Sequence, residues 1–249
     1  MKEIVVITGV TGKLGQNLVD GLQNKYKIVA LVRNLDKAIS LFQKYDIDFI
    51  QCDLSNHDDI IKSCHYINKK YKTIKGLINN AALDINQAME KTTFEELEMI
   101  FKVNTFAPYY LCKYLIESLS KAKGASIINV SSNLACRSIY NATEYSMTKA
   151  SVESLSKSIS VEYGKYGIRC NTLVIGGMPG IMTCVGEEKF FSKKEDDFDD
   201  CKVSIEKIPL GRQGNFNEFI NVFDFLLSNL SSYMTGSKVS VDGGIFIKG

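Results

Sequence analysis

The sequence has little of several features that would mark a class of protein on their own. Its 249 residues include three prolines and no tryptophan, and no Ser/Gly-rich linker divides them into domains. The apolar stretches fall well short of the roughly 18–20 residues that a membrane-spanning helix needs. The 30 Lys and Arg residues almost balance the 28 Asp and Glu residues. This balance removes the usual electrostatic reason to expect nucleic acid or a membrane surface as a partner.

Cysteine and histidine are present but do not form the patterns of a disulfide framework or a metal site. The seven cysteines are scattered and form no Cys-x-x-Cys pair, so we expect free, buried thiols. The two histidines, His57 and His65, lie on a predicted surface helix without a convergent third ligand, and we expect no bound metal. The first residues resemble no secretory signal. We therefore expect a soluble, cytoplasmic protein.

Short apolar runs alternate with amphipathic segments along the whole chain. Strands are predicted at 3–8, 27–32, 48–52, 76–79, 126–131, 168–175 and 238–241, and helices at 13–24, 35–44, 56–71, 93–122, 143–163 and 215–229. Asn56 and Thr93 are suited to be N-caps of their helices. Strict alternation of this kind predicts one α/β domain over residues 1–249, built on a doubly wound parallel sheet of about seven strands with helices on both faces.

Residues 178–208 differ in composition from the rest of the chain. This stretch is highly charged and lies between Gly176-Gly177 and Pro209, after the sixth predicted strand. This composition is compatible with a solvated loop that contains helical pieces. It is equally compatible with a mobile lid over a substrate pocket.

The first predicted strand leads directly into a glycine-rich turn and a helix, Thr8-Gly9-Val10-Thr11-Gly12-Lys13-Leu14-Gly15. Glycines at such a turn let the backbone approach a pyrophosphate, and the helix N-terminus offers N–H groups to it. The spacing differs from the usual G-x-G-x-x-G and by itself gives little support. Dinucleotide binding is supported instead by the position of the glycines at the first strand-to-helix turn. The residues expected to bind a dinucleotide here are Gly9, Thr11, Gly12, Lys13, Leu14 and Gly15.

The end of the second predicted strand bears on the choice between NAD(H) and NADP(H). An acidic residue there would bind the adenosine ribose hydroxyls and repel a 2′-phosphate. This chain has Arg33 instead, whose guanidinium suits a phosphate. The sequence thus favours NADP(H), with NAD(H) still possible and a solvated surface arginine as the alternative. Asp53-Leu54 is placed to meet the adenine, and Asn80 and Ala81 end the fourth strand near the cofactor.

Tyr145 and Lys149 carry the chemical hypothesis, although their spacing alone is uninformative. Tyr-x-x-x-Lys occurs four times, at Tyr66/Lys70, Tyr71/Lys75, Tyr109/Lys113 and Tyr145/Lys149. Only Tyr145 has a hydroxyl residue, Ser132, thirteen positions earlier at the end of a predicted strand, where ligands bind in such sheets. Strand alternation points Ser131 to the opposite face.

The chain resembles a classical short-chain dehydrogenase/reductase along nearly its whole length, and this resemblance implies a Rossmann-like fold. The matching segments are the turn at 8–15, Asp53-Leu54, Asn79-Asn80-Ala81-Ala82, Val103-Asn104, Ser132, Tyr145 to Lys149, Gly167-Ile168-Arg169-Cys170-Asn171, Pro209-Leu210-Gly211-Arg212, Tyr233-Met234-Thr235-Gly236 and Val241-Asp242-Gly243-Gly244.

The resemblance implies an Asn104–Ser132–Tyr145–Lys149 tetrad that moves hydride between nicotinamide C4 and a carbonyl or secondary alcohol. Tyr145 would be the acid/base, and Lys149 would stabilise its phenolate and hold the nicotinamide ribose. Ser132 would bind the substrate oxygen, and Asn104 a water that connects Lys149 to solvent. Gly177 would lie at the nicotinamide.

Two departures from the family pattern affect the cofactor loops. Lys13 stands where the family has a glycine, and Gly176-Gly177 replaces the usual Pro-Gly. The substrate itself stays open between a 3-oxoacyl thioester and a sugar or other alcohol. Candidate substrate contacts are Asn133, Tyr140 and Met178.

Two further questions concern catalysis and assembly. A non-catalytic, NAD(P)-binding sensor or scaffold on the same fold is the alternative from a different class, but such a protein would be expected to have lost members of the tetrad. By analogy with the family, we expect a homodimer or homotetramer, paired through the helices at 93–122 and 143–163.

Overall fold

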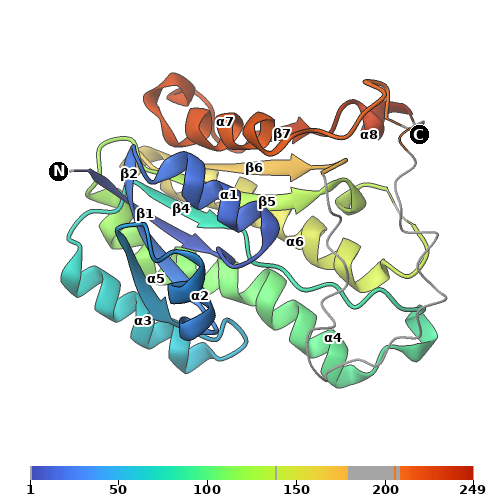
Figure 1. Ribbon diagram of the computed structural model, residues 1–249, viewed down its shortest axis with the longest axis horizontal. Coiled ribbons are helices and arrows are strands. Elements are labelled where there is room, and N and C mark those ends of the chain that lie inside the picture. The colour runs from blue at the N-terminus through green and yellow to red at the C-terminus, as the bar shows by residue number, and fades with distance from the viewer. Residues whose placement is uncertain (1, 138, 179–204, 206–207, 249) are drawn as a thin grey trace.

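The structure is a computed structural model that describes residues 2–137, 139–178, 205 and 208–248 (Figure 1). Most of the predicted lid at 178–208 lies outside the described residues, as do Cys184 and Cys201.

All seven strands form one parallel sheet in the order β3-β2-β1-β4-β5-β6-β7 (Figure 1). The predicted fold class is confirmed. The order reverses between β1 and β4, and a doubly wound sheet binds its ligands at such a switch point, beyond the carboxyl ends of the strands. The strands are β1 (Glu3–Thr8), β2 (Tyr26–Val32), β3 (Ile47–Gln51), β4 (Gly76–Asn79), β5 (Ser126–Ser132), β6 (Arg169–Ile175) and β7 (Lys238–Val241).

Helices cover both faces of the sheet, and the strands supply a separate apolar cluster to each face. Val5 and Ile7 belong to one cluster and Val6 to the other, because successive side chains of a strand point to opposite faces. No helix in the described part of the chain is long and apolar enough to cross a bilayer. The first cluster lies under α1 (Lys13–Leu22), α2 (Leu35–Leu41) and α7 (Phe216–Leu227), and the second under α3 (His57–Lys70), α5 (Ala107–Ser120) and α6 (Thr143–Tyr163).

Both predicted N-caps are confirmed. The Asn56 side chain accepts hydrogen bonds from the first-turn N–H groups of α3. Thr93 forms a capping box with Glu96 at the start of α4 (Phe94–Phe101). Each cap satisfies N–H groups that have no partner within the helix.

The single helix predicted at 93–122 is divided in the structure by a π-turn. It consists of α4, the π-helix η2 (Lys102–Phe106) and α5. Pro108 explains part of this departure, because it has no N–H to donate to the carbonyl of Asn104, four residues earlier. The shorter elements are η1 (Met89–Lys91), η3 (Asn133–Ala135), η4 (Gly164–Tyr166), η8 (Asn229–Ser231) and α8 (Ile245–Lys248).

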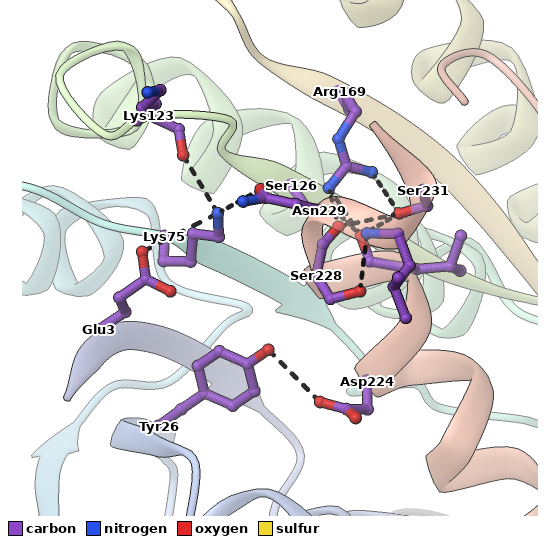
Figure 2. Close-up of polar contacts among 12 residues, drawn as sticks. Glu3, Tyr26, Lys75, Lys123, Ser126, Arg169, Asp224, Ser228, Asn229 and Ser231 are labelled. Carbon is purple, nitrogen blue, oxygen red and sulfur yellow. Dashed lines mark hydrogen bonds and ion pairs between the residues drawn. The ribbon is translucent and has the colours of Figure 1, made fainter. Parts of the chain in front are cut away.

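Two buried cations stabilise the amino edge of the sheet, opposite the ligand edge (Figure 2). The Arg169 guanidinium donates to the carbonyls of Leu226 (2.9 Å) and Ser228 (3.1 Å) at the end of α7, and to the Ser231 hydroxyl (2.8 Å). Lys75 Nζ donates to the carbonyl of Lys123 at 3.1 Å. The Glu3 carboxylate lies 3.9 Å from Lys75 Nζ. These acceptors offset the cost of burying the charges, and the cation at the end of α7 complements the helix dipole.

Replacing Arg169 by methionine keeps much of the side-chain volume but removes every donor. The three buried acceptors would then have no cationic partner, and we expect the free energy of unfolding to fall by about 3 kcal/mol. Urea denaturation measures the change. Lys157→Met, on the exposed face of α6, is the control and should change stability by less than about 0.5 kcal/mol. Equal stability of the two variants would contradict this account.

Candidate active site

The glycine turn between β1 and α1 packs so closely that two of its glycines cannot carry a side chain. Gly9 has φ +71°, and a Cβ there would lie 2.7 Å from the Cα of Ala81. A Cβ on Gly15 would lie 2.1 Å from the carbonyl oxygen of Gly9. Gly12 differs, because a Cβ there would meet only the Gly9 carbonyl, at 3.6 Å. Gly12 is also the N-cap of α1 and satisfies no N–H group through a side chain. The turn therefore leaves room and unpaired donors where a phosphate could bind.

The turn is held against the end of β4 by Thr8 and Asn80. The buried Thr8 hydroxyl accepts from the N–H groups of Asn80 and Ala81, each at 3.0 Å. The Asn80 amide donates to the carbonyls of Thr8 and Gly9, each at 3.1 Å. Asn80 and Ala81, predicted at the cofactor, thus lie in direct contact with the turn. Thr8 is the supporting residue that the predicted site omitted.

Lys13, which stands where the family has a glycine, does not adopt a backbone conformation that requires glycine. It is the first residue of α1, it is exposed, and it is not among the residues with positive φ. Leu14 is buried in the core beside it, and the Thr11 carbonyl accepts from Gln16. The first turn of α1 has no acidic residue. Lys13 therefore adds a positive charge to the positive end of the helix dipole.

The residues predicted around the adenosine lie at the ends of β2 and β3. Arg33 is exposed directly after β2 and makes no ion pair with any described residue. One Asp53 oxygen accepts from the N–H (2.9 Å) and hydroxyl (2.7 Å) of Ser55, which orients the carboxylate. Leu54 packs against the second apolar cluster.

Tyr145 and Lys149 differ from Tyr66 and Lys70 by burial, since these two pairs share their relative geometry. Lys149 Nζ lies 5.4 Å from the centre of the Tyr145 ring, and Lys70 Nζ lies 5.8 Å from that of Tyr66. Tyr66 is 50% exposed, whereas Tyr145 is 8% exposed and Lys149 3%. Lys149 Nζ also donates to the carbonyl of Val130 in β5, at 2.9 Å. Because solvent access is low at both side chains, burial shifts the pKa of Tyr145 and of Lys149.

Ser132 is the serine of β5 that meets Tyr145. The Ser132 hydroxyl lowers the pKa of the Tyr145 phenol, by offering it a hydrogen-bonding partner. The Ser132 hydroxyl also accepts from the N–H of Leu134 at 3.3 Å, in the first turn after the strand. Ser131 points to the other side and donates to Glu153 in α6, at 2.9 Å.

Asn104, in the π-turn, ties three segments of the site together. Its side-chain oxygen accepts from the N–H of Leu83 at 2.7 Å, and its amide donates to the Leu83 carbonyl at 2.8 Å. The same amide donates to the Thr148 hydroxyl at 3.1 Å, between Tyr145 and Lys149 on α6. The segment after β4 is thereby held beside the tyrosine and lysine.

Comparison with known proteins gives a consistent result. A profile of the family described as enoyl-(acyl carrier protein) reductase matches residues 18–245. The 3-oxoacyl-[acyl-carrier-protein] reductase of Buchnera aphidicola is 27% identical over 250 residues, which cover 99% of this chain and 98% of that protein. The L-xylulose reductase of Caenorhabditis elegans is 27% identical over 248 residues, covering 96% and 94% of the two chains.

A solved structure extends the similarity to three dimensions. The aldohexose dehydrogenase of Thermoplasma acidophilum, in ligand-free form, superposes with a TM-score of 0.85 at 27% identity, covering 99% of this chain and 94% of that one. The chain belongs to the classical short-chain dehydrogenase/reductase family. It is accordingly an oxidoreductase, and the predicted family and reaction type are confirmed.

Burial dominates the protonation of the acid/base pair in this dehydrogenase/reductase. It raises the pKa of Tyr145, the negative charge of Asp84 raises it further, and the Ser132 hydrogen bond lowers it. Burial lowers the pKa of Lys149 to about 8, and Asp84 opposes that shift. The protein alone therefore keeps Tyr145 protonated at neutral pH.

Asp84 is, besides Thr8, a residue that the predicted site omitted. It follows β4 by five positions, just after the Asn-Asn-Ala-Ala segment. The available signal was that Asp84 is the first acidic residue after a strand end at the ligand edge of the sheet.

The residues predicted to contact nicotinamide and substrate lie in different environments. Gly177 has φ +62°, and its carbonyl accepts from the N–H of Gly214. Asn133 is 8% exposed, and its side-chain oxygen has no partner among the described residues. Tyr140 is 86% exposed, and Met178 packs against the first apolar cluster.

The histidines and cysteines are the residues for which the sequence predicted neither a metal site nor a disulfide. His57 lies 3.0 Å from the Tyr114 hydroxyl, which gives this histidine a partner other than a metal. The described cysteines are free thiols, but the prediction that they are all buried is wrong for Cys136, which is exposed. Cys136 lies after β5 on the η3 turn, where the backbone leaves the core.

Alanine substitutions at Gly12 and Gly15 should separate cofactor binding from folding. Gly12→Ala fits the backbone, so stability should hold or rise by about 0.5 kcal/mol while the Kd for NADPH increases at least about tenfold, because the methyl group enters the phosphate site. Gly15→Ala should unfold the turn and cost about 3 kcal/mol or more. Fluorescence titration and urea denaturation measure the two effects. Unchanged NADPH binding in folded Gly12→Ala would exclude this turn as the phosphate site.

Proposed function

We propose that this short-chain dehydrogenase/reductase is an NADP(H)-preferring reductase of a small carbonyl compound, with Tyr145 as the acid and base. The observation that carries the proposal is the buried Tyr145–Lys149 pair beside Ser132, at the carboxyl edge of the sheet. An NAD(P)-binding sensor would not need a buried acid/base pair with a serine donor next to it.

The protonation of the site suits reduction of a carbonyl. NADPH, held by the glycine turn and by Lys149, would supply the hydride for the carbonyl carbon. Tyr145, protonated at neutral pH, donates its proton to the carbonyl oxygen, and the carbonyl becomes a secondary alcohol. The Ser132 hydroxyl donates a hydrogen bond to the same oxygen as negative charge develops on it. In the reverse direction, the Tyr145 phenolate accepts the alcohol proton.

Lys149 has the donors needed to hold the cofactor and to return the proton. One Nζ–H is used by the Val130 carbonyl, which leaves two for ribose hydroxyls and a water. Both amide hydrogens of Asn104 are used by Leu83 and Thr148. A water that connects Lys149 to solvent would therefore be bound through the Asn104 main-chain carbonyl, for which Pro108 offers no N–H.

Arg33 supports the preference for NADP(H). It is exposed directly after β2 and forms no ion pair with a described carboxylate. The end of β2 also lacks the acidic residue that would repel a 2′-phosphate. A guanidinium there binds a 2′-phosphate, whereas NAD(H) would leave it without a ligand. Asp53 and Leu54 are proposed to contact the adenine.

For the substrate we propose two candidate classes, and for the assembly a homo-oligomer. The relatives include a reductase named for 3-oxoacyl-[acyl-carrier-protein], and a reductase and a dehydrogenase named for sugars, and both substrate classes remain candidates. Exposed apolar side chains on α4, η2, α5 and α6 support a homodimer or homotetramer. They are Phe94, Phe106, Tyr109, Met147 and Val161.

Tyr145→Phe should lower kcat for carbonyl reduction by about 1,000-fold, because the ring is kept and the transferable proton is lost. NADPH oxidation at 340 nm with a panel of ketones and β-keto esters measures it. Tyr66→Phe, in the exposed pair of the same spacing, should leave kcat unchanged. Retention of activity in Tyr145→Phe would exclude Tyr145 as the acid.

Arg33→Asp should weaken NADPH binding by about 100-fold and leave NADH binding unchanged or tighter, since the change replaces attraction to the 2′-phosphate by repulsion. Nicotinamide fluorescence titrations with both cofactors measure the effect. Lys37→Asp, near the start of α2, controls for the general change of surface charge. A wild-type preference for NADH would contradict the proposal.

A further inference from the structure

A thiol, an ammonium and a carboxylate from three different segments meet beside the turn that follows Ser132. Cys136 is the C-cap of η3, Lys238 is the first residue of β7, and Glu153 lies in the middle of α6. Lys238 Nζ lies 2.6 Å from Cys136 Sγ and donates to Glu153 Oε2 at 2.9 Å. Cys136 Sγ lies 3.9 Å from the same Glu153 oxygen. The three reactive groups therefore form a closed triangle, and none of them belongs to the catalytic tetrad.

Two of the three groups are held in place by regular structure. Glu153 is 9% exposed and accepts from the Ser131 hydroxyl of β5 at 2.9 Å. Lys238 pairs with Thr172 of β6, and its Nζ lies 5.5 Å from the centre of the Phe246 ring. The carboxylate and the ring together fix the ammonium against the sulfur, whereas an ordinary surface lysine samples many conformations.

Cys136 differs from the other described cysteines in that a solvent-borne reagent can reach it. Its side chain is exposed, whereas Cys52, Cys64, Cys112 and Cys170 are buried. Burial raises the pKa of Cys52 to about 11 and that of Cys64 and Cys112 to about 12, which makes these thiols inert. The thiolate is the nucleophilic form of cysteine, and a cation in contact with the sulfur stabilises its charge.

Lys238 can supply both a proton and, after losing it, a nucleophile. Partial burial lowers the pKa of its ammonium, but the hydrogen bonds to Cys136 and Glu153 outweigh burial, and the pKa lies above its ordinary value. At neutral pH a proton is therefore available to a leaving group at the sulfur. The amine that remains is a nucleophile in direct contact with the same sulfur.

We propose that Cys136 and Lys238 form a covalent modification site, at which hydrogen peroxide oxidises the sulfur and the two side chains become joined by an S–N bond. The chemistry has two steps. First, the Cys136 thiolate attacks one peroxide oxygen and the O–O bond breaks, so that the sulfur is oxidised to a sulfenic acid and the peroxide is reduced. The leaving hydroxide takes a proton from the Lys238 ammonium and becomes water.

The second step uses the amine that the first step has produced. The Lys238 nitrogen attacks the sulfur of the sulfenic acid, the S–O bond breaks, and a sulfenamide forms. The Glu153 carboxylate accepts the proton that the nitrogen loses and passes it to the leaving hydroxide, which becomes a second water. In total, one thiolate, one ammonium and one hydrogen peroxide give one sulfenamide and two waters.

Peptide mass spectrometry of the whole protein after treatment with hydrogen peroxide tests the inference. In the wild type we expect a pair of peptides joined between Cys136 and Lys238, lighter than the separate peptides by two hydrogens and separated again by dithiothreitol. Lys238→Arg keeps a cation beside the sulfur but supplies no neutral amine. This variant should lose the cross-link, and dimedone added in a parallel sample should label its Cys136 as the sulfenic acid.

Two further variants control for the change of lysine. Lys157→Met, on the exposed face of α6, removes a lysine elsewhere on the surface and should form the cross-link to the same extent as the wild type. Lys238→Gln, which also has no amine nucleophile, replaces Lys238→Arg if that variant does not fold.

Each of three results in the wild type would overturn the inference. They are a Cys136 that stays a thiol in excess peroxide, a Cys136 sulfenic or higher acid with an unmodified Lys238, and a disulfide between Cys136 and Cys184 or Cys201. A cross-link that dithiothreitol does not open would also contradict an S–N bond. All of these readouts are covalent masses, so they are independent of the proposed carbonyl reduction, which the activity of Tyr145→Phe tests separately.

Discussion

The geometry of the site depends on one buried amide. Asn104 lies in a π-turn and holds the backbone of Leu83 at both its N–H and its carbonyl, with a third hydrogen bond to Thr148 on α6. All three contacts are 3.1 Å or shorter, and the side chain is 1% exposed. A buried amide with satisfied partners positions its neighbours rigidly, because breaking any contact leaves a polar group unpaired. The segment after β4, the π-turn η2 and the part of α6 that carries Tyr145 and Lys149 are therefore held together.

The two edges of the sheet treat buried charge in opposite ways. At the amino edge, Arg169 is satisfied by main-chain carbonyls and a hydroxyl. Lys75 is satisfied by the Lys123 carbonyl, the Asn229 side chain and the Glu3 carboxylate, so both charges stabilise the fold. At the carboxyl edge, Lys149 has one carbonyl acceptor and a pKa lowered to about 8 by burial. Because Lys149 Nζ has one protein acceptor, its other N–H groups are left for a ligand. This arrangement lowers stability, a cost that enzymes commonly accept at active sites.

The fold was predictable because its signals are local. Apolar runs with β-branched residues located the strands, and Asn56 and Thr93 located two helix starts, since capping needs only a side chain and the next turn. The π-turn was not predicted, because apolar spacing continues through it and the loss of one N–H at Pro108 does not dictate the response of the helix. Cys136 was wrongly expected to be buried, because burial of a cysteine depends on what packs over it rather than on its type.

The sequence by itself determined the architecture, the glycine turn and the acid/base hypothesis, since strand alternation and short motifs are encoded by neighbouring residues. The sequence already favoured Tyr145/Lys149 through Ser132, thirteen positions earlier. Only the tertiary structure showed how this pair differs physically from Tyr66/Lys70, whose cation–ring geometry is nearly the same. Burial differs between the two pairs, and burial arises from segments far apart in the chain. Asp84 shows the same limit. Its charge matters to Tyr145, sixty-one residues away, because Asn104 and a shared apolar cluster bring the two segments together.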